Sequence, residues 1–228
     1  MSGSGDEKYS REALFQRRLA DLRAKNEQFP WNMEDVPEFD LPKDQSKLFA
    51  DRSIEDPNLS DEEIERRALL DLTSYNFWTF YKRLNYECRR ARRYERELCL
   101  LLVCIDDLQR VSRRHGLSAE NQVVLSAGRV LLSCVRDVDI AGRCRDDTFG
   151  VILPETPIRG AEIAAERIRT KMEEEVAVFD QTQIPLSVSV AGTHLTGRDQ
   201  QVDSLVAIAI EGLKECMAGG GNSVIVIE

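Results

Sequence analysis

Long apolar runs, paired cysteines and an excess of positive charge are all missing from this sequence of 228 residues. No segment approaches the roughly 18 consecutive apolar residues that a membrane-spanning helix requires. The opening residues, MSGSGDEKYS, lack the basic and apolar regions of a signal peptide. The net charge of -9 disfavours nonspecific binding to nucleic acids or membrane surfaces, because a surface that follows phosphates needs positive charge. We therefore expect a cytoplasmic protein that binds neither nucleic acid nor membrane.

The cysteines include no C-x-x-C pair of the kind that binds metal ions or carries out redox chemistry. Most of them lie within apolar runs, where a free thiol behaves as a small apolar side chain, and scattered buried thiols are typical of a reducing cytoplasm. No combination of Ser, His and Asp, or of Cys and His, indicates a nucleophilic catalyst. The six cysteines are Cys88, Cys99, Cys104, Cys134, Cys144 and Cys216.

The first 59 residues differ in composition from the rest of the chain. Residues 11–28 can form a short helix with a thin apolar edge, but the segment after them is dense in proline and acidic residues. Such a segment buries too little apolar surface to offset the entropy lost on ordering it. We expect residues 1–59 to be a flexible N-terminal segment. It is either a solubilising leader or a docking tail with Trp31 and Phe39 among its anchors.

Residues 60–228 are predicted to form one domain in which helices and strands alternate. The capping box of Ser60 and Glu63 begins a first helix, and a long amphipathic helix follows from Thr73. Its end, RRARRYERE, is expected to be a solvated helix face rather than a nucleic-acid site. This order predicts an α/β (α+β) domain with a sheet covered by helices. Further helices are expected at 119–135, 157–176 and 203–217, and strands at 99–106, 139–144, 149–153, 184–195 and 222–227.

Several segments at matching spacing resemble the GGDEF domain, the diguanylate cyclase fold related to the nucleotide cyclase catalytic core. LDLTSYNFWTFYKRL resembles the family's opening D-x-L-T-G-L-x-N-R-x-x-F helix, and LCLLLVCIDDLQRV resembles its L-D-I-D-x-F-K strand. RDVDIAGRCRDDTFGVILPET resembles R-x-x-D-x-x-x-R-x-G-G-D-E-F-x-x-x-L-P-x-T. The resemblance covers residues 69–228 and implies a central, mostly antiparallel sheet of about five strands flanked by helices. It also implies a relation to enzymes that condense two GTP molecules into cyclic di-GMP.

The positions that hold Mg²⁺ and the triphosphate in the family carry other residues here. The first metal-binding Asp of the family corresponds to Cys104, and a thiol is a poor ligand for an ion that prefers oxygen. The family's two turn glycines, which allow close approach of phosphates, correspond to residues with side chains. The whole signature turn reads Arg145, Asp146, Asp147, Thr148 and Phe149.

The positions that contact guanine and the distal phosphates in the family also differ. The guanine-binding Asn and Asp correspond to Ser112 and Asn121, and the phosphate-binding Lys and Arg correspond to Met217 and Gly221. Losing one transition-state contact commonly costs ~10²–10³ in rate. The resemblance therefore implies a degenerate domain that is not an enzyme and needs no Mg²⁺ cofactor.

A second site of the family, the inhibitory R-x-x-D site that binds cyclic di-GMP, is retained. Arg136 and Asp139 match its two named positions, and Arg167 matches an arginine that the next helix adds. An arginine fork can pair with guanine O6 and N7, and a carboxylate can accept from guanine N1–H and N2–H₂. The alternative is purely structural, with Arg136 capping the preceding helix and Asp139 opening a strand.

We expect an inactive receptor that binds cyclic di-GMP at Arg136, Asp139 and Arg167 and signals through contact with a protein partner. A bound nucleotide dimer could also bridge two copies of the chain. A scaffold that binds no nucleotide, with Arg145 and Asp146 as contact residues, is the main alternative. Residual cyclase activity with another geometry is a third hypothesis.

Overall fold

The computed structural model describes residues 69, 72, 77–197 and 200–227, and every structural statement below concerns these residues. The helix expected over 11–28, the domain boundary near residue 60 and the capping box lie outside them and stay predictions. Among the described helices, none is both long and apolar enough to cross a membrane.

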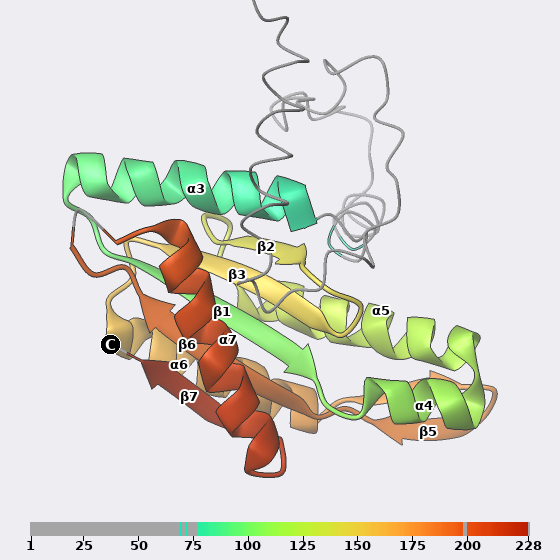
Figure 1. The fold of residues 1–228 in the computed structure, drawn as a ribbon. Helices are drawn as coiled ribbons and strands as arrows, with labels where there is room; N and C mark the ends of the chain where they lie inside the picture. The colour runs from blue at the N-terminus through green and yellow to red at the C-terminus, as the bar shows by residue number, and fades with distance from the viewer. Residues whose placement is uncertain (1–68, 70–71, 73–76, 198–199, 228) are drawn as a thin grey trace, which may run out of the picture. The chain divides into compact units, whose positions relative to one another are not determined.

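The centre of the fold is a five-stranded sheet with the strand order β2-β3-β1-β6-β7 (Figure 1). The central strand β1 (Leu98–Ile105) pairs antiparallel with β3 (Thr148–Pro154) and with β6 (Val188–His194). At one edge β2 (Ile140–Arg143) is antiparallel to β3, and at the other β7 (Val224–Ile227) is parallel to β6. The expected mostly antiparallel sheet of about five strands is confirmed.

Helices cover both faces of this sheet. One face carries α3 (Phe77–Tyr94) and α7 (Val202–Ala218). The other face carries α5 (Leu117–Cys134) and α6 (Ile158–Glu173). The α3 helix is tied to the start of α7, because the Tyr81 hydroxyl donates a hydrogen bond to the Asp203 carboxylate.

The core follows from the alternation of side chains along β1. All eight residues of this strand are buried, as a continuous apolar run between two helical layers predicts. Leu101 and Val103 pack into the cluster formed with α5 and α6. On the opposite face, a Cβ atom added to Gly150 would overlap the Phe80 ring of α3. Glycine is therefore required at this position for α3 to pack closely on the sheet.

The structure corrects the prediction around residue 176. The helix expected over 157–176 ends at Glu173, and a separate hairpin of β4 (Val176–Phe179) and β5 (Thr182–Pro185) follows. Its two-residue turn, Asp180 and Gln181, has φ angles of 45° and 67°. The strand expected over 184–195 is correspondingly interrupted, and β6 begins at Val188.

A second difference lies after β1. An additional helix, α4 (Leu108–His115), separates β1 from α5. It is short and polar, and only Leu108 within it is buried. A helix with so little apolar periodicity carries almost no signal in the sequence. The six cysteines of the prediction are all free and buried, as expected.

Candidate functional site

The R-x-x-D segment forms a closed turn between α5 and β2. The Asp139 carboxylate accepts a hydrogen bond from the main-chain N–H of Arg136 at 2.8 Å. The main-chain N–H of Asp139 donates back to the Arg136 carbonyl at 3.0 Å. Asp139 thus fixes the turn, and its other oxygen, Oδ1, accepts no hydrogen bond from the described residues. The Arg136 side chain is exposed and pairs with no residue that the structure describes.

The third predicted residue reaches the same turn from another helix. Arg167 on α6 is exposed, and its guanidinium donates a hydrogen bond to the Cys134 carbonyl at 2.7 Å. Cys134 is the last residue of α5 and stands two positions before Arg136. The side chain that caps this helix end is therefore Arg167, whereas the structural alternative assigned that role to Arg136. All three predicted residues lie at the junction of α5, β2 and α6.

The signature turn between β2 and β3 is closed by its own backbone and by a neighbouring arginine. The main-chain N–H groups of Cys144 and Arg145 both donate to the Thr148 carbonyl, at 2.8 and 3.1 Å. The guanidinium of Arg143 donates to the carbonyls of Arg145 and Asp146, at 3.2 and 2.6 Å. The turn is thus held in one shape, with the side chains of Arg145 and Asp146 exposed.

Cys104 faces this turn from β1. It stands opposite Thr148 in the β1–β3 register and is 3% exposed. Burial, reinforced by the nearby Asp147 carboxylate, raises the pKa of the Cys104 thiol to about 12, so the thiol is neutral near pH 7. The Asp147 carboxylate accepts a hydrogen bond from the Thr148 hydroxyl at 2.7 Å and lies 4.0 Å from the Arg145 guanidinium. Within the described part of the chain, no cluster of three or more His, Cys, Asp or Glu residues is arranged to hold a metal ion.

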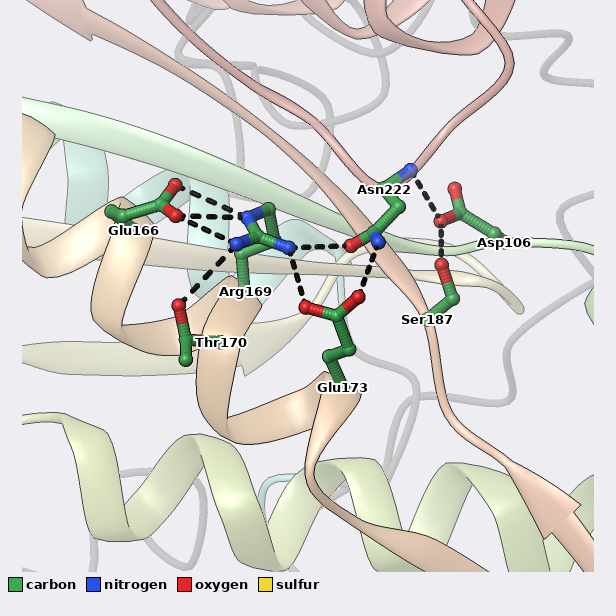
Figure 2. A network of polar contacts seen from close by, with 7 residues as sticks. All are labelled: Asp106, Glu166, Arg169, Thr170, Glu173, Ser187 and Asn222. Carbon is green, nitrogen blue, oxygen red and sulfur yellow. Dashed lines mark hydrogen bonds and ion pairs between the residues drawn. The ribbon is translucent and has the colours of Figure 1, made fainter.

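A network that the sequence analysis missed is centred on Arg169 of α6 (Figure 2). Its guanidinium bonds to Glu166 at 2.7 Å and to Glu173 at 2.9 Å, and it donates to the Asn222 side chain at 2.8 Å. Asn222 also donates to Glu173 at 2.9 Å. The spacing of the two glutamates around Arg169 is visible in the sequence. The contact with Asn222, far along the chain, is not.

Asp106, at the end of β1, holds the other side of the same loop. Its carboxylate accepts hydrogen bonds from the hydroxyls of Ser187 and Ser189, at 2.6 and 2.7 Å. It also accepts from the main-chain N–H of Asn222 at 2.9 Å (Figure 2). Asp106 therefore links the end of β1 to the start of β6 and to the loop before β7. The glycine-rich loop before β7 is therefore hydrogen-bonded to both β1 and α6.

Comparison with known proteins shows which family this chain belongs to. The family model described as "Diguanylate cyclase, GGDEF domain" matches residues 72–223. Diguanylate cyclase A of Treponema denticola is 27% identical over 155 residues, which cover 68% of this chain and 42% of the relative. Diguanylate cyclase DgcM of Escherichia coli K12 is 29% identical over 126 residues, which cover 55% of this chain and 30% of the relative. The chain thus spans less than half the length of these relatives.

Solved structures share the fold. The GGDEF domain of DgcB from Caulobacter crescentus, in complex with c-di-GMP, superposes with a TM-score of 0.63 at 20% identity, covering 66% of this chain and 87% of that chain. Diguanylate cyclase SiaD from Pseudomonas aeruginosa, in complex with its activator SiaC, superposes with a TM-score of 0.64 at 18% identity, covering 95% and 77%. At these identities the similarity establishes the fold alone.

Proposed function

The chain belongs to the GGDEF family, and from that premise we propose that it is a catalytically inactive member that binds cyclic di-GMP and signals through a protein partner. The proposed ligand site consists of Arg136, Asp139 and Arg167. The observation that carries the proposal is the hydrogen bond from Arg167 to the last carbonyl of α5, which brings a second guanidinium to the R-x-x-D turn.

The chemistry of the turn suits a guanine dinucleotide. The Arg136 side chain is exposed and pairs with none of the described residues, so its guanidinium is available for guanine O6 and N7 or for a phosphate. Arg167 uses one of its five N–H donors on Cys134, which leaves others for a phosphate or a base. Asp139 Oδ1 is buried and accepts no hydrogen bond from the described residues. A guanine N1–H or N2–H₂ would supply the missing donor, and adenine does not offer these donors in the same pattern.

The absence of cyclase activity is supported by the residues around the signature turn. A neutral, buried thiol at Cys104 does not fit Mg²⁺, which takes oxygen ligands and is usually bound through carboxylates. Asp147 is left as a single carboxylate, and it already accepts from Thr148. The Asp146 carboxylate at the turn would repel a triphosphate. These groups offer neither the metal ligands nor the open backbone that phosphate binding at this turn requires.

Titration calorimetry with cyclic di-GMP tests the ligand proposal directly. We expect saturable binding to the full chain and a loss of at least about tenfold in affinity for Arg136→Ala and for Arg167→Ala, because hydrogen bonds to charged groups contribute roughly 1.5–3 kcal/mol. Arg129→Ala, an exposed arginine on α5, is the matched control and should bind like the parent. Equal heats from the parent and Arg136→Ala would refute the proposal.

A scaffold that needs no nucleotide is the second candidate, favoured by the exposed Arg145 and Asp146 on a rigid turn. If the chain is a scaffold, calorimetric titration with cyclic di-GMP gives no heat. A protein partner recovered from cell extract is then lost when Asp146 is substituted and is still recovered with Arg136→Ala. If recovery of the partner instead requires cyclic di-GMP and Arg136, the result favours the receptor.

A further inference from the structure

The strand β7, with the sequence VIVI, forms one outer edge of the five-stranded sheet (Figure 1). Its inner side pairs with β6, and its outer side pairs with no strand that the structure describes. Edge strands are commonly protected from pairing with other chains by a charged side chain, a proline or a bulge. β7 contains none of these, because all four residues are apolar and their register with β6 is continuous.

The opposite edge of the sheet is protected. There β2 contains the charged Arg143, and α3 packs against the strand. A Cβ atom added to Gly142 of β2 would lie only 3.0 Å from the Phe80 ring of α3. Of the two edges of this sheet, β7 is therefore the one that is open to another chain.

Helices cover both faces of β7 but leave its edge open. On one face, a Cβ atom added to Gly212 of α7 would lie 3.7 and 3.4 Å from the side chains of Ile225 and Ile227. On the other face, Val224 and Val226 pack against the main core cluster. All four side chains are nevertheless only half-buried. Because both faces are packed, the remaining exposure lies along the open edge.

The hydrogen bonds to β6 determine which backbone groups of β7 point outward. The Ser223 carbonyl accepts a hydrogen bond from the Val190 N–H at 2.9 Å, so the backbone of Ser223 faces β6. Successive residues of a strand direct their N–H and C=O groups to opposite sides. Ile225 therefore also faces β6, whereas Val224 and Val226 direct their N–H and C=O groups to the open edge.

We propose that β7 pairs antiparallel with β7 of a second copy of the chain, around a two-fold axis at Ile225. In this register Val224 of one copy lies opposite Val226 of the other, and each such pair exchanges two N–H···O=C hydrogen bonds. All the outward-facing N–H and C=O groups of both strands are then satisfied. An axis centred on Val224 or Val226 would pair only one of the two outward-facing residues within β7.

The strand itself favours a second copy over a strand of another protein. An unlike strand would have to supply two outward-facing residues at the same spacing with uncharged, apolar neighbours, and β7 itself meets this requirement. Both α6 and α7 pack more closely on β6 than on β7, which leaves room for the second copy. The two-fold axis also ends the assembly at two copies, because each β2 edge stays covered.

The pairing is separate from the proposed ligand site. The R-x-x-D turn of Arg136 and Asp139 directly precedes β2, at the opposite edge of the sheet from β7. A dimer formed through β7 therefore needs no bound dinucleotide. It differs in this respect from two copies bridged by cyclic di-GMP.

Sedimentation velocity of the full chain without nucleotide, at concentrations of about 1–100 µM, measures the association. We expect a dimer whose fraction rises with concentration. Val224→Pro removes an outward-facing N–H, and proline at the first residue of an edge strand leaves the hydrogen bonds to β6 intact. Its dimer dissociation constant should be at least about tenfold higher. Gln201→Pro, at an exposed residue whose φ of -74° suits proline, is the control and should associate like the parent.

Cysteine substitutions test the register. In Ile225→Cys the two new thiols face each other across the axis, at a non-hydrogen-bonded pair whose Cα atoms are about 4.5 Å apart, which suits a disulfide. Oxidation should therefore give a covalent dimer on a non-reducing gel. In Ile227→Cys, on the same face, the two thiols are four positions out of register, roughly 13 Å, and should not cross-link. The native cysteines are all buried and give little background.

Arg136→Ala should form this dimer as the parent does, which keeps the inference apart from the proposed function. Three results would overturn it: the chain stays monomeric over the whole concentration range, folded Val224→Pro associates like the parent, or Ile227→Cys cross-links as readily as Ile225→Cys. Circular dichroism shows whether Val224→Pro is folded. If it is not, the two cysteine variants decide.

Discussion

The guanidinium of Arg167 on α6 donates a hydrogen bond to the Cys134 carbonyl, 2.7 Å away, at the last residue of α5. The final carbonyls of a helix have no partner within it and carry partial negative charge, so a cation there is stabilising. One side chain thus joins two helices and stands beside the turn that contains Arg136 and Asp139. The same residue is therefore expected to serve stability and ligand binding together.

The contribution of Arg167 to stability can be measured without any ligand. We expect Arg167→Ala to lower the free energy of unfolding by about 0.5–1.5 kcal/mol, the usual worth of one hydrogen bond, with a small addition from the helix dipole. Urea unfolding followed by circular dichroism measures the change. Arg159→Ala, an exposed arginine on the same helix, should stay within about 0.5 kcal/mol of the parent. Equal unfolding midpoints for the two variants would show that the Cys134 contact is not formed in solution.

Gly221 stands where the family's phosphate-binding arginine is expected, and a side chain there would contact Asp106. Gly221 has a φ of 80°, and a Cβ atom would lie 3.0 to 3.1 Å from the Asp106 carboxylate. That carboxylate is held by Ser187, Ser189 and the Asn222 N–H and cannot move freely. We expect Gly221→Ala to destabilise the protein by more than the roughly 1–2 kcal/mol that left-handed backbone alone costs.

Gly197 provides the matched control for this prediction. Its φ is 72°, and a Cβ atom there would have nothing within 4 Å. Gly197→Ala should therefore report the backbone cost alone, and the difference between the two variants in thermal or urea unfolding reports the contact with Asp106. Equal losses in both variants would mean that the Asp106 carboxylate gives way. Gly221→Arg should not restore a phosphate site, because the arginine side chain meets the same obstacle.

The sheet was predictable because its strands carry strong local patterns. The apolar run of β1 and the alternation in β6 predicted both strands within a few residues of their ends. The β4–β5 hairpin was missed because its turn, Asp180 and Gln181, contains no glycine although both residues have positive φ. Two-residue hairpin turns are usually recognised in a sequence by Asn-Gly or Asp-Gly. Without that signal, the preceding helix was extended into the strand.

The candidate sites were predictable to different degrees. Arg136, Asp139 and Arg167 could be named because the resemblance aligned them, whereas their meeting at the end of α5 depends on the packing of α6. The burial of Glu87 could not be foreseen, because this glutamate lies in an arginine-rich helix, where charged side chains usually face solvent. Burial of one charged residue depends on which side of the helix meets the sheet and its neighbours. That is a property of the tertiary structure.

The Arg169 network should make stability depend on pH in a defined direction. Hydrogen bonding from Arg169 lowers the pKa of Glu166, and hydrogen bonding from Asn222, with Arg169 second, lowers the pKa of Glu173. A carboxyl with a lowered pKa contributes stability above its unfolded pKa, about 4.3 for glutamate, and loses that contribution as the pH falls through its folded pKa. Arg169→Ala should therefore lower the melting temperature at pH 7, and the difference from the parent should shrink as the pH falls below about 4.

The decrease in melting temperature caused by Arg169→Ala will be modest, because both glutamates are largely exposed and surface ion pairs are screened by water. Lys214→Ala is the control, since it removes an exposed single pair with Glu211. We expect a smaller change in melting temperature from Lys214→Ala than from Arg169→Ala at pH 7. If the difference in melting temperature between Arg169→Ala and the parent stayed constant from pH 7 to pH 3, Arg169 would stabilise the protein through packing and not through its carboxylate partners.

Cys104 offers a direct test of the proposed inactivity. Cys104→Asp restores the carboxylate that the resemblance expects, but places it at a position that is 3% exposed and close to Asp147. Burial and the neighbouring negative charge should raise the pKa of the new carboxyl, so the variant should lose stability as the pH rises through the ordinary aspartate pKa of about 3.9. Cys104→Ser separates this charge effect from loss of the thiol, because it adds no charge.

Neither the parent nor Cys104→Asp should convert GTP to cyclic di-GMP, because Arg145 and Asp146 still occupy the turn where phosphates would approach. Incubation with GTP and Mg²⁺ or Mn²⁺, followed by chromatography, measures the product. Product formed by Cys104→Asp alone would show that the turn tolerates a triphosphate and that the thiol is what silences the site. Product formed by the parent would refute the proposed inactivity, because a neutral thiol and one carboxylate would then suffice where the chemistry of Mg²⁺ demands more oxygen ligands.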